Sequence, residues 1–332
     1  MQAWVHNIWY GQHWAKYLLW PLSLVFGVIS SVRRTLFNLG VKQAVSLPVP
    51  VIVVGNITAG GSGKTPTVLY LIELLRANGY KPGVISRGYG VKLTQPLWVS
   101  RDANASDVGD EPAMLVRRSG VPMVVAPDRI AAAHLLLERG DVDVILCDDG
   151  LQHYRLARDI ELIVIDGDRR LGNGLLLPAG PLREGPWRLA DAEFIIANGK
   201  AQPQEYPMSL VSGGLYHLNG DICEPLTGKS VVAMAAIGNP ERFFSSLKQQ
   251  GLQLTKQQAF ADHAAFVEQE LDNLSGGLPL VMTEKDAVKC RDFAKPHWCY
   301  LAVNAKLTPE FDSRLLSRLA DVATKKGNYH GV

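Results

Sequence analysis

The chain has 332 residues, 47% of them hydrophobic and 20% charged, and its 34 basic and 32 acidic side chains give a net charge of +2. This composition excludes a mainly disordered chain. The length suits two domains or one large one. The charge balance gives no reason to expect a nucleic-acid partner. Four cysteines are too few to staple a chain of this size, which excludes a disulfide scaffold; they are Cys147, Cys223, Cys290 and Cys299. They form no CxxC pair, which argues against a zinc knuckle or a thioredoxin-like motif, and scattered free thiols suit a reducing cytosol.

The N-terminal segment is basic, apolar and free of acidic residues as far as Glu73. An apolar run at residues 17–32 is followed by Arg33 and Arg34. Four of the seven tryptophans lie ahead of this run or within it: Trp4, Trp9, Trp14 and Trp20. Tryptophan favours the membrane–water interface, and the basic side chains can reach lipid headgroups. These features predict a helix that lies in or dips into one leaflet.

Two other interpretations of this run stay open. A helix that crosses a bilayer needs about 20 apolar residues, and this run is shorter and contains Pro21 and Gly27. The run also fits a helix buried against the main domain. A signal peptide fits poorly, because Arg33 and Arg34 stand where a small-residue cleavage site would be.

Beyond the prolines at positions 48 and 50, strand and helix patterns alternate. Strands are predicted at residues 51–54, 83–86, 121–126, 142–147, 161–165 and 193–197. Helices are predicted at residues 65–78, 110–119 and 129–139, the last with Asp128 as its N-cap. Such alternation indicates βαβ units and a mostly parallel sheet.

Residues 51–65 read VIVVGNITAGGSGKT, a buried strand that runs into a glycine-rich turn and then a helix. This context is typical of a P-loop, in which backbone N–H groups converge on phosphate oxygens. Lys64 would reach the β- and γ-phosphates of a nucleotide, and Thr65 would offer its hydroxyl to Mg²⁺. The residues expected to bind the nucleotide are Thr58, Ala59, Gly60, Gly61, Ser62, Gly63, Lys64 and Thr65.

The loop departs from the usual pattern at two positions. Thr58 stands where the common motif has glycine. Ala59 stands where partitioning ATPases of the deviant type have lysine, which argues against that group.

Residues 142–150 read VDVILCDDG, a hydrophobic strand that ends in Asp148 and Asp149. Carboxylates at the carboxyl edge of a parallel sheet lie beside the phosphate site and can hold Mg²⁺. Successive residues of a strand point to opposite faces, so only one of the two need face the metal, and which one stays open. A simple Asp-Asp-Gly turn is the alternative.

Residues 201–220 are rich in proline and glycine and contain one short alternating piece at 209–211, so we interpret them as a joint between two domains. A second α/β pattern follows. Strands are predicted at 230–236, 278–282 and 300–303. One helix is predicted to begin at Asn239 and Pro240, and a last helix at 309–323 is followed by a frayed tail at 325–332.

Seven motifs, in this order, resemble the tetraacyldisaccharide 4'-kinases over essentially the whole chain. They are GNITAGGSGKTP at 55–66, ISRGYG at 85–90, GDEP at 109–112, DDGLQH at 148–153, PAGPLRE at 178–184, FADH at 260–263 and TEKDAVK at 283–289. The resemblance implies transfer of the γ-phosphate of ATP, with Mg²⁺, to the 4'-hydroxyl of a tetraacyldisaccharide 1-phosphate in lipid A biosynthesis. It places the enzyme at the cytoplasmic face of the bacterial inner membrane.

The resemblance also implies the architecture. We expect an α/β protein with an N-terminal membrane-associated helical segment at 1–45 and a P-loop kinase-type α/β/α domain at 46–205. A smaller α/β domain at 206–332 would close over the active-site cleft. The expected partners are the lipid disaccharide and the inner-membrane surface. Protein partners, oligomeric state and acyl-chain preference are left open.

By the same resemblance, Asp110 would take the proton of the acceptor hydroxyl, with His263 hydrogen-bonded to it. Helix capping by Asp110 and a structural His263 on a helix that opens at Asp262 are the alternatives. Arg183 would act as an arginine finger, and Glu184 and Glu111 would serve the metal or its waters.

Three other assignments also stay open. Arg183 and Glu184 are alternatively a surface ion pair. Arg87 and Tyr89 are candidate contacts for the substrate's anomeric phosphate or sugar. His153 is left between a partner of the Asp148–Asp149 pair and a packed histidine.

Two other functions would fit the P-loop. One is a switch or partitioning ATPase, and the other is a kinase for a water-soluble sugar or vitamin precursor, in which the apolar N-terminus would be core. Transfer of label from γ-labelled ATP to a disaccharide lipid distinguishes these from a lipid kinase.

Overall fold

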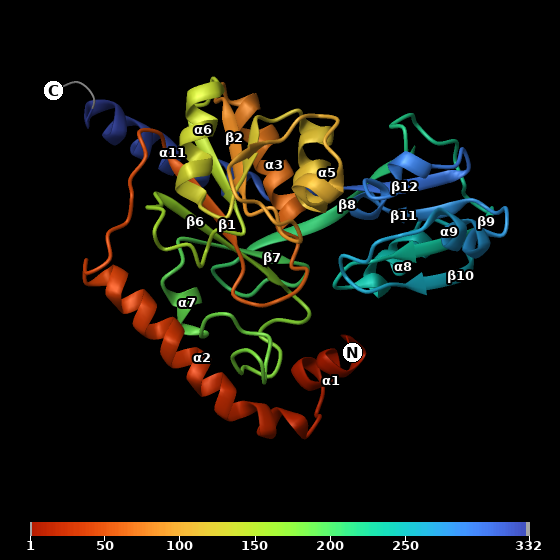
Figure 1. Cartoon of the computed structure of the whole chain (residues 1–332), viewed down its shortest axis with the longest axis horizontal. Helices are drawn as coiled ribbons and strands as arrows, with labels where there is room; N and C mark the ends of the chain where they lie inside the picture. Colours follow the sequence, from red (N-terminus) through yellow and green to blue (C-terminus); the bar gives the residue numbers. More distant parts are fainter. Residues whose placement is uncertain (1, 330–332) are drawn as a thin grey trace.

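The computed structural model describes residues 2–329, and most of them surround one twelve-stranded sheet (Figure 1). The strand order is β10-β9-β11-β12-β8-β7-β6-β1-β5-β2-β4-β3. Among the strand pairs of the described residues, only β3 with β4 and β8 with β12 are antiparallel, so the mostly parallel sheet predicted from the sequence is confirmed.

The half of the sheet that follows the N-terminal helices has β1 and β5 as neighbouring inner strands. Its strands are β1 (Val51–Gly55), β2 (Pro82–Ser86), β3 (Leu97–Trp98), β4 (Met123–Val125), β5 (Val144–Asp148), β6 (Ile160–Asp166) and β7 (Phe194–Asn198). Its helices are α3 (Lys64–Ala77), α4 (Ala105–Val108), α5 (Asp110–Ser119), α6 (Arg129–Arg139) and α7 (Trp187–Ala190).

Alternate residues of β1 point to opposite faces of the sheet, and helices pack on both of these faces. Ile52 and Val54 pack with residues of α3, α5 and the C-terminal helix α11 (Pro309–Tyr329). Val51 and Val53 pack with residues of α6. The predicted P-loop kinase-type α/β/α arrangement is therefore confirmed, and burial on both faces explains why β1 and β5 are continuous apolar runs.

The second half of the sheet contains β9 (Ser230–Ala235), β10 (Gln253–Ala259), β11 (Leu280–Thr283) and β12 (Trp298–Lys306). Its helices are α8 (Pro240–Gln249), α9 (Glu268–Ser275), α10 (Glu284–Ala287) and the 3-10 turn η1 (Arg291–Phe293). This is the second, smaller α/β unit expected from the sequence. Helix α11 follows β12 in the chain but packs back on the first half, through Phe311 and Leu315.

The predicted joint at residues 201–220 is largely a strand, β8 (Tyr206–His217), which crosses between the halves (Figure 1). Its first residues pair parallel with β7, and residues from Ser209 onward pair antiparallel with β12. The sequence interpretation of a joint did not include this long strand, because Gly214, with a φ of +101°, accompanies a register shift in the β8–β12 pairing and does not turn the chain. The domain boundaries at 45/46 and 205/206 stay predictions, since β8 belongs to both halves.

The FADH segment also differs from the prediction. Asp262 and His263 lie in a loop after β10, His263 has a φ of +61°, and the next helix begins only at Glu268. A helix cannot begin at a residue with left-handed backbone geometry. At the other end, α11 continues to Tyr329, beyond the predicted end at residue 323, and the last part of the predicted tail lies outside the described residues.

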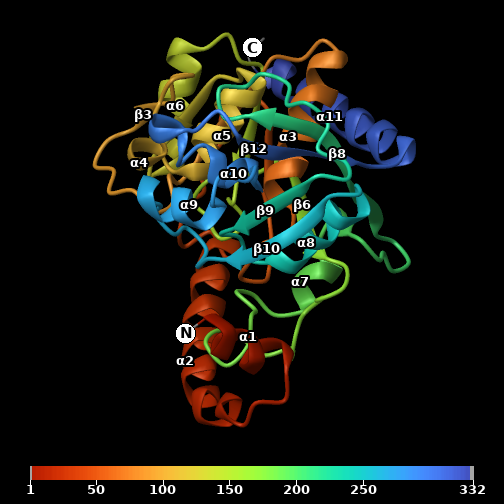
Figure 2. The same cartoon turned by 90° about the vertical axis from the view of Figure 1, so that its right-hand side faces the viewer.

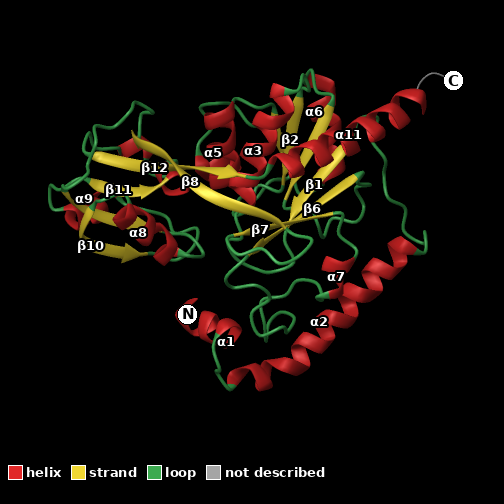
Figure 3. Cartoon of the chain, turned by 180° about the vertical axis from the view of Figure 1, so that it is seen from behind, coloured by secondary structure: helices red, strands yellow, loops and turns green. Residues whose placement is uncertain are grey.

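Helices α1 (Gln2–Tyr10) and α2 (Ala15–Asn38) extend away from the rest of the chain (Figures 2 and 3). Helix α2 has 24 residues, and its length and hydropathy are sufficient for it to cross a membrane. Only 11% of its apolar window is buried within the protein. One of its contacts with the rest of the chain is made by Ser23, whose hydroxyl donates to the Leu176 carbonyl and accepts from the Ala179 N–H at 2.8 and 3.0 Å. Nearer its C-terminal end, Arg34 donates to Asp191 at 2.8 Å, and the Phe37 ring lies beside that of Tyr154.

The other face of α2 is exposed and apolar. The large side chains on it include Tyr17, Leu18, Trp20, Leu22, Leu24, Val25, Val28, Ile29 and Val32. This exposure does not agree with the alternative of a helix buried against the main domain.

Candidate active site

The P-loop has the backbone geometry of an anion-binding turn. Gly60 and Gly63 have φ values of +107° and +102°, which side chains disfavour. Side-chain amides of Asn56 and Asn198 donate to the carbonyls of Gly60 and Ser62, at 3.2 and 3.1 Å, and so turn the peptide planes. Within residues 2–329, the N–H groups of residues 60–63 have no protein acceptor. They remain available to a phosphate.

The first two residues of the predicted nucleotide loop have another role. Thr58 forms a β-bridge with Leu182, and the N–H of Ala59 donates to the Pro181 carbonyl at 2.7 Å. Both residues therefore anchor the loop to the PAGPLRE segment.

The second half of the sheet reaches the P-loop through the turn between β9 and α8. A Cβ atom added at Gly238 would lie 2.8 Å from the backbone nitrogen of Gly61. Only glycine permits this approach without a shift of the loop.

Lys64 and Arg183 share one carboxylate, that of Asp149. The Lys64 ammonium lies 3.3 Å from its Oδ1, and Arg183 donates to Oδ1 at 3.0 Å and Oδ2 at 3.1 Å. Burial by itself would raise the pKa of Asp149, but the two cations hold it below its ordinary value. Asp149 is therefore an ionised group that orients the two cations expected to bind the nucleotide.

Asp148 has the opposite environment. Its side chain is 1% exposed, and neither of its oxygens has a partner in the described part of the chain. Burial, then the nearby Glu111 and Asp149, raise its pKa to about 7. A buried carboxylate without hydrogen bonds is costly unless a cation binds to it. The carboxylate of Asp148 therefore fits Mg²⁺, which prefers oxygen ligands, and the Thr65 hydroxyl at the start of α3 stays the other predicted ligand.

The other two predicted metal residues are already paired. Glu184 is buried and accepts from Gln152 and the Tyr154 hydroxyl, both at 2.7 Å, and Arg188 lies 3.4 Å away. These contacts use both of its oxygens, so a direct metal bond from Glu184 is the least supported of the predicted roles.

Glu111 lies 3.3 Å from the ammonium of Lys285. Its charge is one of those that raise the pKa of Asp148, which places it near the proposed metal position.

Asp110 and His263 meet across the two halves. Asp110 is the first residue of α5, and its Oδ2 lies 3.1 Å from Nδ1 of His263. The other ring nitrogen, Nε2, is 3.4 Å from the ammonium of Lys285. Because an ammonium group only donates, Nε2 accepts and Nδ1 carries the proton that His263 donates to Asp110.

The electrostatics around Asp110 favour its ionised form. Burial opposes this, but the His263 hydrogen bond and the nearby Lys289 and Lys285 bring its pKa below the ordinary value. The pair is thus an ionised carboxylate held by a hydrogen bond from His263.

A cavity of about 610 Å³ joins these groups to α2. Its lining includes Asp110, Asp148 and His263. From α2 it also includes Phe26, Ser30 and Arg33, from the start of α6 Arg129, and from loops Arg87, Tyr89 and His153.

The roles of Arg33 and Arg129 in this cavity were not predicted. No local motif marks Arg33, and the only signal for Arg129 is a charged residue directly after the N-cap of α6, where it is 4% exposed.

One cavity holds an orphaned strand-end carboxylate and an Asp–His pair, and Asp149 in its lining pairs with Lys64 of the phosphate-binding turn. These features define a P-loop phosphotransferase. The family model of tetraacyldisaccharide-1-P 4'-kinase matches residues 15–320. Tetraacyldisaccharide 4'-kinases of Shewanella sp. (strain W3-18-1) and Shewanella amazonensis are 60% and 57% identical, each over 100% of both chains.

The crystal structure of LpxK from Aquifex aeolicus in complex with ATP is also similar. It has a TM-score of 0.77 and 28% identity, and the match covers 92% of this chain and 99% of that one. The chain belongs to the tetraacyldisaccharide-1-P 4'-kinase family.

Proposed function

We propose that this chain is an ATP-dependent kinase that phosphorylates the 4'-hydroxyl of a tetraacyldisaccharide 1-phosphate, a precursor of lipid A. The observation that carries the proposal is the single cavity that reaches from Asp148 and Asp149 to Phe26 and Arg33 of α2. A lipid with its chains along α2 would thereby present its sugar to the groups that act on ATP.

On the donor side, the free amides of residues 60–63 and the Lys64 ammonium bind the terminal phosphates of ATP. Mg²⁺, held by Asp148 and the Thr65 hydroxyl, would supply neutralisation of phosphate charge. Asp149 holds Arg183 in the cavity, from which its guanidinium stabilises charge on the transferred group.

On the acceptor side, Asp110 accepts the proton of the attacking hydroxyl, and His263 fixes the orientation of that carboxylate through its Nδ1–H. The proton leaves the hydroxyl as its oxygen bonds to phosphorus.

Arg33, Arg87 and Arg129 give the same cavity a cationic wall that suits the 1-phosphate of the acceptor. Arg87 and Tyr89 lie in this lining, as the sequence interpretation expected of contacts to the phosphate or sugar.

The exposed apolar face of α2, followed by Arg33 and Arg34, suits a membrane surface with anionic headgroups. We place the enzyme at the cytoplasmic face of the inner membrane, where ATP is available and the acceptor lipid is embedded. The second half of the sheet, which carries His263 and Gly238, would close over the bound nucleotide.

The test uses γ-labelled ATP, Mg²⁺ and tetraacyldisaccharide 1-phosphate in detergent micelles. Label is expected to move to the lipid with wild-type protein and with Lys248→Ala, whose lysine is exposed on α8. Lys64→Ala is expected to abolish the transfer. Release of labelled phosphate by the wild type, with none on the lipid, would contradict the proposal and favour a hydrolytic switch.

A further inference from the structure

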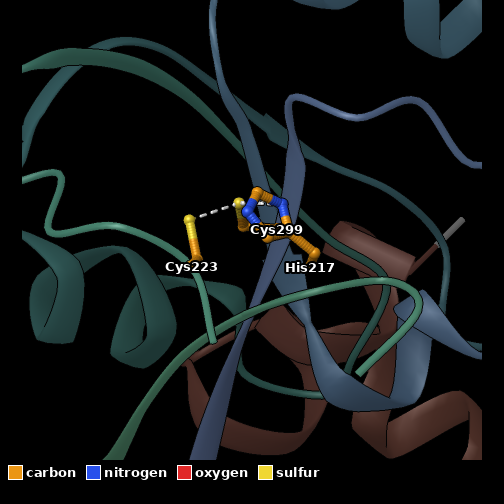
Figure 4. Close-up of side chains that lie close together, drawn as sticks. All are labelled: His217, Cys223 and Cys299. Carbon is orange, nitrogen blue, oxygen red and sulfur yellow. Dashed lines mark hydrogen bonds between the residues drawn. The ribbon is translucent and has the colours of Figure 1, made fainter. Parts of the chain in front are cut away.

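Two cysteines and a histidine meet in the second half of the sheet, outside the active-site cavity (Figure 4). His217 and Cys223 are six positions apart in the sequence, and Cys299 lies 76 positions after Cys223. His217 is the last residue of β8 and lies directly opposite Cys299 of β12 in the antiparallel pairing. Cys223 follows a short return of the chain, and its N–H donates to the carbonyl of Leu215 at 2.9 Å. The end of β8, the return segment after it and strand β12 thus place one donor each at the same point.

The donor atoms have the spacing of a metal site. The Cys299 sulfur is 3.6 Å from Nδ1 of His217 and 2.8 Å from the Cys223 sulfur, and all three atoms lie within 4.8 Å of one another. Tetrahedral Zn²⁺ with bonds of about 2.3 Å to sulfur and about 2.0 Å to nitrogen requires edges of about 3.5 to 3.8 Å. The histidine edge matches, and the sulfur edge needs to widen by about 1 Å.

The geometry leaves room for that change. Cys223 lies between β8 and β9, outside both strands, whereas Cys299 and His217 are fixed by the β8–β12 ladder. A cavity of about 200 Å³ adjoins the cluster, with Cys223, Cys299, Glu224 and His297 in its lining. Displacement of the Cys223 side chain into this space is therefore possible without a change in the sheet.

A second observation points to a ligand at the same place. Nε2 of His297, two residues before Cys299, is buried and has no hydrogen-bond partner among residues 2–329. His297 lines the same cavity as the three donors. A buried imidazole nitrogen without a partner is unfavourable unless a water or a cation binds to it.

We propose that His217, Cys223 and Cys299 form a binding site for one thiophilic divalent ion of the Zn²⁺ type, with its fourth position toward His297. Two sulfur donors and an imidazole select such an ion over Mg²⁺ or Ca²⁺, which prefer oxygen. The cysteine spacing argued against a zinc knuckle, but that argument covers only sites built from local sequence. Here the sheet supplies what a CxxC motif would otherwise provide.

Such an ion would connect the end of β8 to β12 and to the segment around Cys223. Because none of its ligands lines the active-site cavity, the expected effect is on stability and not on the phosphoryl-transfer step.

The site is tested with the full chain, kept reduced with a phosphine and saturated with Mg²⁺ and an ATP analogue so that the P-loop site is occupied. Co²⁺ is the spectroscopic probe. One equivalent is expected to give a thiolate-to-cobalt absorption band with the intensity of a tetrahedral site, and Zn²⁺ is expected to displace it. Competition with a chelating dye then gives the Zn²⁺ affinity.

The variants Cys223→Ser, Cys299→Ser and His217→Asn are expected to weaken Zn²⁺ binding at least about 10-fold. The matched controls are Cys290→Ala and His134→Asn, which remove a cysteine and a histidine outside the cluster and are expected to bind Zn²⁺ like the wild type. Zn²⁺ is also expected to raise the melting temperature of the wild type and of both controls, but not that of His217→Asn, which leaves both buried thiols in place.

Absence of the thiolate band in the reduced wild type would overturn the proposal. So would a band of equal intensity in Cys223→Ser and Cys299→Ser. A protein that binds no Zn²⁺ when reduced, and that forms a Cys223–Cys299 disulfide in air, would show that the pair is a redox couple and not a metal site.

Discussion

Nδ1 of His263 lies 3.1 Å from Oδ2 of Asp110, although 153 positions separate the two residues in the chain. Asp110 begins α5 in the first half of the sheet, and His263 lies in the loop after β10 in the second. The pair forms only when the two halves of the sheet lie against each other, as they also do where Gly238 approaches the P-loop. The proposed base therefore depends on the same arrangement of the two halves.

Replacement of the proposed base is the first test of this pair. Asp110→Asn keeps the size of the side chain but removes the acceptor of the hydroxyl proton. The rate of label transfer to lipid is expected to fall about 10²- to 10⁴-fold, with little change in ATP affinity. Asp107→Asn, an exposed change three positions earlier, is the control. An Asp110→Asn enzyme with normal turnover would remove Asp110 from the mechanism.

Lys285 is expected to act on the pair as a positioning residue. Its ammonium donates to Nε2 of His263 and pairs with Asp262 and Glu111. It also contributes to the lowered pKa of Asp110. In Lys285→Met that contribution is lost, so the pKa of Asp110 rises and the acid limb of the pH–rate profile moves to higher pH.

Lys285→Arg, which keeps a cation at this place, is expected to retain most of the wild-type profile. The measurement is turnover over a pH series for the three proteins. If Lys285→Met loses activity by the same factor at every pH, Lys285 has only a structural role.

The raised pKa of Asp148 predicts a pH dependence of stability. The folded chain keeps this proton up to about pH 7, whereas the unfolded chain loses it near the ordinary pKa of 3.8. Between those values the folded state binds more protons, so the free energy of unfolding falls as the pH rises. Thermal unfolding without Mg²⁺ is expected to show this fall, and Mg²⁺ is expected to offset it at the alkaline end.

The comparison that isolates Asp148 is with Asp148→Asn, in which the slope is expected to be smaller. Asp321→Asn, an exposed change on α11, is expected to keep the wild-type slope. Equal slopes in all three proteins would show that Asp148 ionises normally in the fold.

The sequence predicted the parts of the fold in which local pattern and burial agree. Strand β1 and the first four residues of β5 are continuous apolar runs because helices cover both faces of the sheet. Asp128 was predicted to cap α6, and its side chain accepts from the N–H of Ile130 at 3.0 Å. The P-loop lies where its motif placed it, between β1 and α3.

The elements that the sequence missed depend on tertiary contacts. Strand β10 reads QLTKQQA and is a polar edge strand, so no alternation of buried residues marks it. Strand β8 contains glycines that disfavour a strand in a local pattern, and its pairing partner β12 is remote in the sequence. Arg33 of α2 and Arg129 of α6 line one cavity, and no spacing in the sequence indicates that these two helices lie near each other.

Arg33 tests the acceptor side of the cavity. It is exposed on α2 and lines the cavity, where its charge would meet the anionic headgroup of the acceptor. Arg33→Gln is expected to raise the KM for the lipid by about 10-fold, the scale of one charge-assisted hydrogen bond, and to leave the KM for ATP unchanged. Arg155→Gln, outside that lining, is the control. A parallel rise in both KM values would indicate a general disturbance.

The apolar stripe of α2 tests the membrane surface. Leu22, Val25 and Ile29 follow one another at helical spacing, and each is more than half exposed. Entry of such a stripe into the interfacial region of a bilayer is favourable, by roughly 25 cal/mol per Å² of apolar surface that leaves water. The triple variant Leu22→Asn, Val25→Asn and Ile29→Asn is therefore expected to reduce association with anionic vesicles by about 10-fold or more. Cosedimentation with vesicles measures the association.

ATP binding by the same triple variant is expected to be unchanged, because these three side chains lie outside the cavity lining. The control is Ile222→Asn, which removes one exposed apolar side chain on the second half of the sheet and is expected to cosediment like the wild type. Full cosedimentation of the triple variant would show that another surface attaches the enzyme to lipid, and that α2 serves the cavity alone.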